Sequence, residues 1–147
     1  MYSRILVATD GSTLSKKAER SAIALAAAMG SDLIALSVVP RYPMSYFQGG
    51  VANSPEDLAR TEKQWADSGQ GIVDAVQQAA TAGGVNGKAV VMRSDLVAES
   101  VMAAAKKYKC GLIVMASHGR KGFKRVLLGS ETTNVLTHST IPVLVIR

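Results

Sequence analysis

MASHGRKGFKRVLLGS, residues Met115–Ser130, follows the apolar run 112–115 and leads directly into residues 131–133, which are typical of a first helical turn. Three glycines and four basic residues lie in this stretch: Gly119, Gly122 and Gly129, with Arg120, Lys121, Lys124 and Arg125. A strand that ends in a glycine-rich cationic loop before a helix is an arrangement that binds phosphate. Glycines let backbone amides approach an anion, and the helix start offers unpaired N–H groups. An ordinary surface loop with solvated lysines is the alternative interpretation of the same composition.

The composition of the 147 residues predicts one domain, residues 1–147, with a well-filled core, because 48% of the side chains are hydrophobic. The single cysteine, Cys110, excludes an intrachain disulfide, and there is no Cys/His cluster for a structural zinc site. Asp10 interrupts the first apolar run, and no stretch approaches the ~18 apolar residues of a membrane span. We therefore expect a cytoplasmic protein without a signal peptide or a membrane contact.

The net charge of +6 arises from 17 basic and 11 acidic residues, and the densest basic group lies in the loop described above. Aromatic residues make up only 5% of the chain and are not interleaved with the basic ones, which argues against a nucleic-acid partner. A compact phosphate ligand explains this local cluster better than a polynucleotide does.

Short apolar runs alternate with helical patterns along the chain. Strands are expected at residues 4–9, 33–39, 88–92, 112–115 and 142–146. The helices between them are expected to begin at Ser12 or Thr13, at Ser54, at Asp95 and at Ser130. This order predicts an α/β fold, a single three-layer domain in which a five-stranded parallel sheet of order 3-2-1-4-5 carries two helices on each face.

Three details of this pattern allow further expectations. The second helix should bury one face, composed of Leu58, Trp65, Ile72, Val76 and Ala79. Asp95 and Glu99 have the spacing of a metal or acid/base pair, but capping and the helix dipole explain these carboxylates more simply. Residues 41–54 have no periodicity, and we expect a long binding loop or lid there.

In a parallel sheet of this order, the ends of the first and fourth strands lie side by side where the winding reverses, and ligands bind at that point. The residues that end these strands are Ala8, Thr9 and Asp10 on one side and residues 115–119 on the other. The convergence of two such segments favours a binding site over an ordinary surface loop.

With Asp10 after the first strand and SHGRKGFKRVLLGS after the fourth, the chain resembles the universal stress protein family over essentially all of its residues. The nucleotide-binding branch of that family has the motif G-x2-G-x9-G-[S/T]. Gly119, Gly129 and Ser130 match its last three fixed positions, and Ala116 stands in place of the first glycine. Alanine adds one methyl group at a position where the backbone would approach the ligand, so this departure weakens the match to the motif.

The resemblance implies an ATP site, with Mg²⁺ beside the phosphates. By this resemblance Ala8, Thr9 and Val38 would lie near the adenine, and Asp10 beside the ribose and phosphates, where it would hold the Mg²⁺. The ribose–phosphate side would be formed by Met115, Ala116, His118, Gly119 and Arg120, and the phosphates would be held by Gly129, Ser130, Glu131 and Thr132, with the Glu131 carboxylate pointing outward. The family also implies a homodimer through the last strand, Pro142–Ile146, whose apolar edge would otherwise be exposed.

Other nucleotide and catalytic motifs are absent from the sequence: there is no GxxxxGK[ST], no GxGxxG after a strand and no HExxH. No catalytic residue is assigned. Three hypotheses remain at this point: an ATP-binding regulatory protein, a dimeric interaction protein that binds no nucleotide (which Ala116 favours), and a slow ATPase.

Overall fold

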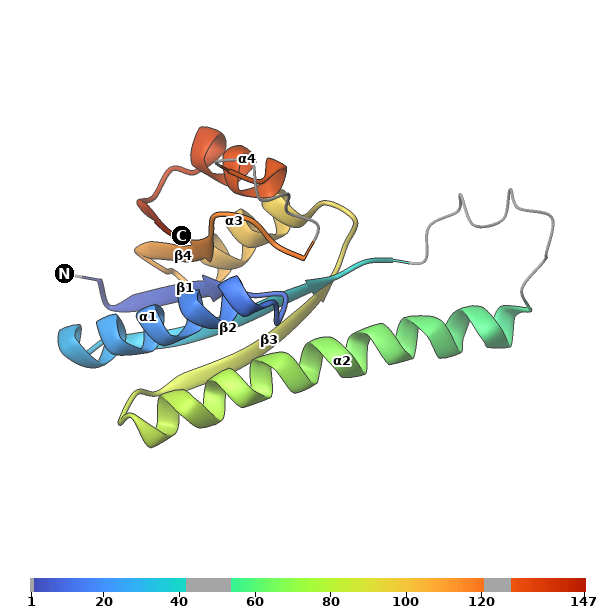
Figure 1. Ribbon diagram of the computed structural model, residues 1–147, viewed down its shortest axis with the longest axis horizontal. Helices are drawn as coiled ribbons and strands as arrows, with labels where there is room; N and C mark the ends of the chain where they lie inside the picture. The colour runs from blue at the N-terminus through green and yellow to red at the C-terminus, as the bar shows by residue number, and fades with distance from the viewer. Residues whose placement is uncertain (1, 42–53, 121–127) are drawn as a thin grey trace.

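The computed structural model describes residues 2–41, 54–120 and 128–147 (Figure 1). In this part of the chain one parallel sheet has the order β3-β2-β1-β4-β5. Its strands are β1 (Arg4–Ala8), β2 (Asp32–Val39), β3 (Gly87–Arg93), β4 (Leu112–Ala116) and β5 (Val143–Ile146). The predicted strand order is therefore confirmed, as are the strand positions to within one or two residues at each end.

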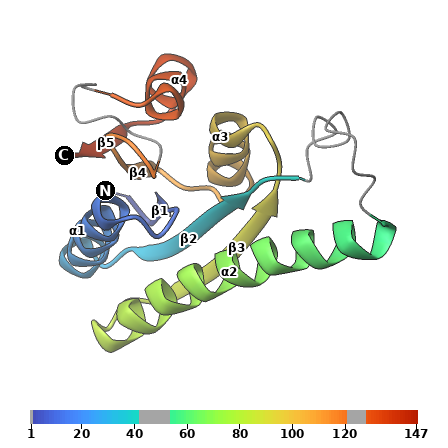
Figure 2. The same cartoon turned by 45° about the vertical axis from the view of Figure 1, so that its right-hand side comes forward.

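Two helices cover each face of the sheet, as predicted (Figure 2). The helices α1 (Thr13–Met29) and α2 (Pro55–Ala82) pack on one face, and α3 (Val97–Lys107) and α4 (Ser130–His138) pack on the other. Neighbouring residues of β1 alternate between the two faces: Ile5 and Val7 join the cluster under α1 and α2, and Leu6 joins the cluster under α3 and α4. The sheet is thus buried on both sides, which is why its strands read as continuous apolar runs.

The helix ends follow local chemistry. The Ser12 side chain accepts a hydrogen bond from the Ser15 backbone N–H and caps α1, which ends at Gly30 with a φ of 66°. Ser54 caps α2 in the same way, with Pro55 as the first helical residue. The two helix starts were predicted, because serine caps have strong positional preferences, and the left-handed conformation at the end of α1 is one that glycine favours.

Two details of the prediction are wrong. Asp95 does not cap α3: the residue before that helix is Leu96, which makes no side-chain cap, and the Asp95 carboxylate accepts a hydrogen bond from the Arg41 backbone N–H at 3.1 Å. On α2, Ala79 is exposed, and Ala80 is buried in its place. The buried face of α2 runs through Gly69, Val73, Val76 and Ala80, and Gly69 packs against β2 without a side chain.

Residues 42–53, which contain most of the expected lid, and residues 121–127, with Gly122, Lys121, Lys124 and Arg125, lie outside the described residues. Within the described ranges, no helix combines the length and the apolar character that a membrane span requires.

Gly69 and Gly71 of α2 offer a matched pair of substitutions. A Cβ atom on Gly69 would lie 2.7 Å from Cγ1 of Val39 in β2, whereas a Cβ on Gly71 would meet no atom within 4 Å. We expect Gly69→Ala to lower the free energy of unfolding by about 1–3 kcal/mol through overpacking. We expect Gly71→Ala to raise it by up to about 1 kcal/mol, because alanine favours the helix. Urea unfolding followed by circular dichroism measures both; equal effects would contradict the close packing of α2 on β2.

Candidate functional site

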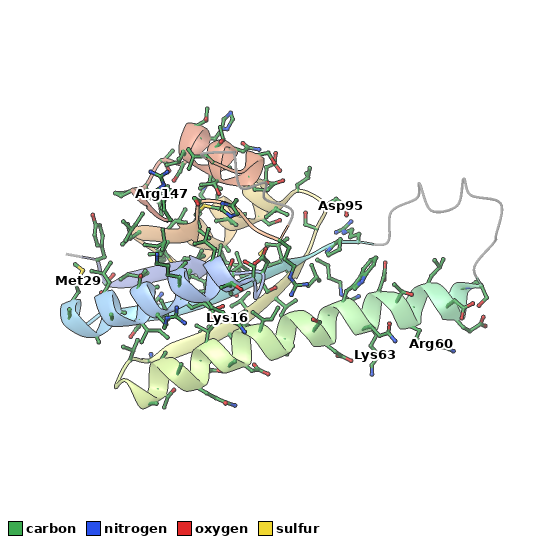
Figure 3. All side chains as sticks on the ribbon, in the orientation of Figure 1. Lys16, Met29, Arg60, Lys63, Asp95 and Arg147 are labelled. Carbon is green, nitrogen blue, oxygen red and sulfur yellow. The ribbon has the colours of Figure 1, made fainter. Side chains whose placement is uncertain are left out.

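The turn after β1 and the loop after β4 meet at the carboxyl edge of the sheet. Asp10, in the first of these segments, accepts a hydrogen bond on Oδ2 from the backbone N–H of Arg120, 110 positions later, at 2.9 Å. Figure 3 marks this edge by Asp95, which follows the end of β3, and marks the opposite edge by Met29. The two segments that the sequence predicted to converge are therefore in direct contact.

Asp10 organises the turn in which it lies. Its Oδ1 accepts hydrogen bonds from the Ser12 backbone N–H at 2.9 Å and from the Ser15 hydroxyl at 2.7 Å. Burial alone would raise the pKa of Asp10, but the hydrogen bonds from Ser12, Ser15 and Arg120 outweigh burial and hold the pKa below its usual value. The carboxylate is thus charged at neutral pH and stabilised by its donors.

Glycine is needed where the two segments touch. A Cβ atom on Gly119 would lie 2.5 Å from Asp10 Oδ2, and a Cβ on Gly129 would lie 3.3 Å from the Cα of His118. Gly11, between Asp10 and the cap of α1, has a φ of 76°, which disfavours other residues. A Cβ on Gly11 would also lie 3.4 Å from Nη2 of Arg120, so the Arg120 guanidinium lies over this turn.

Helix α4 begins at this same edge, and within the described ranges no side chain caps its first N–H groups. Its N-cap is Gly129, whose own N–H donates to the Ser117 carbonyl at 2.6 Å. Ser130, the first residue of α4, is exposed. The first N–H groups of a helix have no partner within it, so this start can accept an anion.

Two predicted phosphate contacts are engaged elsewhere through their side chains. The Thr132 hydroxyl is buried and donates to the Ala116 carbonyl at 2.9 Å, so only its backbone N–H is left for a ligand. The Glu131 carboxylate accepts from the Ala98 backbone N–H at 3.0 Å, in the first turn of α3. Glu131 therefore supplies from α4 the cap that α3 does not have in its own sequence.

The remaining predicted residues line the same edge. Ala8, Val38 and Met115 lie within the last two positions of three adjacent strands and pack in the cluster under α3 and α4. Ala116 is 6% exposed and packs in the opposite cluster, under α1 and α2. The Nδ1 atom of His118 lies 3.2 Å from the Ser117 hydroxyl oxygen.

Sequence reasoning missed Glu19. The Thr9 hydroxyl donates to Glu19 Oε1 and accepts from the Gly11 backbone N–H, so Glu19 holds Thr9 in the turn. Burial raises the pKa of Glu19, against the opposing effects of the Thr9 hydroxyl and of Lys16 and Arg20. The available signal was a carboxylate four residues after Ser15, on the face of α1 that the sheet buries.

Comparison with known proteins decides the family. The model of the Universal stress protein family matches residues 1–147. The chain belongs to this family. Among curated relatives, a universal stress protein of Methanocaldococcus jannaschii is 31% identical, over 100% of this chain and 83% of its own length. Universal stress protein YxiE of Bacillus subtilis is also 31% identical, over 100% of both chains.

Solved structures agree with this family fold. Universal stress protein UspA from Lactobacillus plantarum has a TM-score of 0.82 and 25% identity over 99% of this chain and 97% of its own. A universal stress protein solved in complex with cAMP has a TM-score of 0.72 and 23% identity, over 99% and 97% of the two chains. One from Archaeoglobus fulgidus, in complex with dAMP, has a TM-score of 0.65 and 17% identity, over 98% and 97%.

In this universal stress protein, Asp10→Asn tests whether the carboxylate holds the two segments together. In asparagine an NH2 group replaces one of the two carboxylate oxygens and would face the N–H and O–H groups that donate to Asp10. We therefore expect the free energy of unfolding at pH 7 to fall by about 1–3 kcal/mol. Because the folded pKa of Asp10 is lowered, its stabilisation is present above the usual value of 3.8 and is lost as the pH falls through the folded pKa. Urea unfolding between pH 3 and pH 7 should therefore show a difference between the two proteins that shrinks on acidification.

The matched control is Asp67→Asn on α2, where the carboxylate is exposed and pairs with Lys63 at 3.6 Å. We expect this change to cost about 0.5 kcal/mol or less. A loss for Asp10→Asn no larger than that of the control would contradict the role given to Asp10.

Proposed function

We propose that this universal stress protein is a regulatory protein that binds an adenine nucleotide, ATP with Mg²⁺, at the carboxyl edge of its sheet. The observation that carries the proposal is the start of α4, without a side-chain cap, on the edge where Asp10 and Arg120 are in contact. An anion there would accept hydrogen bonds from the first N–H groups of α4 and face the positive end of its dipole. Nucleotide occupancy would alter contacts with partners.

The rest of the edge suits a nucleotide. Ala8, Val38 and Met115 offer apolar contacts on one face of the sheet, which suits the base. Arg120 adds a positive charge over the turn that contains Gly11. Ala116, which replaces the first motif glycine, packs its methyl group into the core under α1 and α2. The replacement is therefore compatible with a ligand at the edge.

Magnesium would depend on the nucleotide. Among the residues that the structure describes, no three His, Cys, Asp or Glu side chains form a group that could hold a metal ion. Asp10 is a single carboxylate, and its Oδ2, with one backbone donor, is the oxygen better placed for a cation. Mg²⁺ commonly binds through one or two carboxylates together with substrate phosphates, so Asp10 fits the part of one such ligand. Bound Mg²⁺ would neutralise phosphate charge.

Relatives support the choice of adenine nucleotides. Two structurally similar universal stress proteins were solved with cAMP and with dAMP, both of which contain adenine and a single phosphate. A triphosphate places more negative charge at the start of α4 than either of these ligands. A titration series of cAMP, dAMP and ATP with and without Mg²⁺ therefore ranks the candidates.

Ser130→Asp is the sharpest test of phosphate binding at α4. A carboxylate in the first helical turn favours the helix, so the fold should persist, but its charge repels a phosphate at the same N–H groups. We expect isothermal titration calorimetry to show saturable ATP binding to the wild type and affinity weakened at least about tenfold in the variant, or about 1.4 kcal/mol.

Gln64→Glu adds the same charge on an exposed position of α2 and should leave nucleotide affinity unchanged. The absence of heat at millimolar ATP would remove the proposal. Wild-type affinity in Ser130→Asp would show that any nucleotide binds elsewhere.

We propose further that the protein is a homodimer through β5. Within the described residues β5 is the last strand on one side of the sheet, and it pairs only with β4. The carbonyls of Pro142 and Ile146 accept hydrogen bonds from backbone N–H groups at β4. Because the backbone polar groups of successive strand residues point to opposite sides, the N–H and C=O groups of Val143 and Val145 lie on the open edge. Leu144 is 38% exposed beside them. Such an edge is normally covered, and a second copy presents the same edge.

Val145→Pro tests the pairing of β5 between two copies. It removes a backbone N–H group from the open edge of β5 and leaves every hydrogen bond between β5 and β4 in place. Proline is tolerated on edge strands, so we expect a folded protein that sediments as a monomer, while the wild type sediments as a dimer. Analytical ultracentrifugation measures the mass, and circular dichroism checks the fold. A dimeric variant would rule out pairing through β5.

A further inference from the structure

A cavity lies at the amino-terminal edge of the sheet, opposite the edge that Asp10 occupies. Its volume is about 150 Å³, and it is lined by residues from the starts of β1, β2 and β3 and from the end of α3: Arg4, Asp32, Leu33, Ile34, Asn86, Lys88 and Tyr108. Figure 3 places this edge at the end where α1 reaches Met29. The cavity is therefore separate from the proposed nucleotide site.

Arg4 is held in place in this cavity by two contacts. Its Nη1 donates to the Tyr108 carbonyl at 3.0 Å, and its Nε lies 3.7 Å from Oδ2 of Asp32. The other oxygen of Asp32 accepts from Nδ2 of Asn86 at 3.3 Å. A guanidinium has five N–H donors, so these contacts orient Arg4 and leave donors for a further acceptor.

Two lysines stand over the ring of Tyr108 beside this arginine. The Nζ atoms of Lys88 and Lys107 lie 5.0 Å and 5.5 Å from the ring centroid. In residues 2–41, 54–120 and 128–147, neither ammonium group has a carboxylate within ion-pair distance. Two cations held near one ring repel each other, and a nearby anion would relieve that repulsion.

The surroundings strengthen this positive charge. Lys106 and Lys109 flank Lys107 and Tyr108 along the chain and are exposed. Asp32 is the one carboxylate in the cavity lining, and it already contacts Arg4 and Asn86. Leu33 and Ile34 also contribute to the lining and are almost fully buried.

We propose that this cavity binds a phosphate group, as free phosphate or as the phosphate of a small monoester. The lining contains an arginine whose guanidinium is oriented by Tyr108 and Asp32, and a lysine, Lys88, without a carboxylate partner among the described residues. Lys107, over the ring of Tyr108, adds a second ammonium group beside the lining. Arginine and lysine side chains recognise phosphate oxygens. The volume is below the roughly 300 Å³ at which pockets for drug-sized ligands begin, so a second nucleotide is too large. The site is independent of nucleotide binding at α4.

The test is a titration followed by the backbone amide NMR signals of the full chain. Inorganic phosphate and glycerol phosphate are added in separate arms at constant low ionic strength. We expect saturable shifts at Leu33, Lys88 and Tyr108, and an affinity at least about tenfold weaker in the double variant Lys88→Ala/Lys107→Ala. Both lysines are exposed, so the variant should fold.

The matched control is Arg60→Ala/Lys63→Ala, which removes two charges from the part of α2 that extends past the sheet (Figure 3). It should keep wild-type phosphate affinity at Tyr108. Tighter binding of glycerol phosphate than of phosphate would assign the site to a monoester, and equal or weaker binding would assign it to free phosphate.

Three results would overturn the proposal: shifts confined to residues 129–133 and Asp10, shifts that grow without saturation, or unchanged affinity in the Lys88→Ala/Lys107→Ala variant. The first result would place phosphate at α4 instead. Failure of ATP to bind at α4, with saturation at Tyr108 retained, would remove the proposed function and leave this site standing.

Discussion

The hydrogen bond between the Asp10 carboxylate and the Arg120 backbone N–H is the constraint on which the carboxyl edge depends. It joins the turn that starts α1 to the loop that precedes α4, and Gly119 makes the approach possible because any side chain there would clash with Oδ2. The same carboxylate accepts from Ser12 and Ser15, so the start of α1 and the path of the chain after β4 are fixed together. The start of α4 is tied to the same loop by the hydrogen bond from the Gly129 N–H to the Ser117 carbonyl.

Most of the fold was predictable from sequence because each element carries its own local signal. Strands buried on both faces read as unbroken apolar runs, and residues Ser12, Gly30 and Ser54 mark helix ends through preferences that need no tertiary context. The start of α4 at Ser130 was predicted for the same reason, since Gly129-Ser130 ends the loop before it.

The errors arose where a contact between distant segments replaced a local one. Aspartate is a common capping residue, so Asp95 was expected to cap α3. The cap instead comes from Glu131, whose carboxylate accepts from the backbone N–H of Ala98, 33 positions earlier. A pattern of neighbouring residues cannot reveal a contact across that separation. The hydroxyl of Thr132, which the family resemblance places beside the phosphates, donates to the Ala116 carbonyl, and its backbone N–H is left for a ligand. The convergence of Asp10 with the loop after β4 was predicted because strand order alone brings the two ends together.

Glu131 serves two helices at once: it lies in the first turn of α4 and caps the first turn of α3. Leu96, directly before α3, has no polar atom in its side chain to take over this role. A related sequence with a small residue at position 131 would leave α3 uncapped unless a serine, threonine or aspartate stood at position 96. Positions 96 and 131 are therefore expected to covary among homologues, as an evolutionary record of the contact between the two helices.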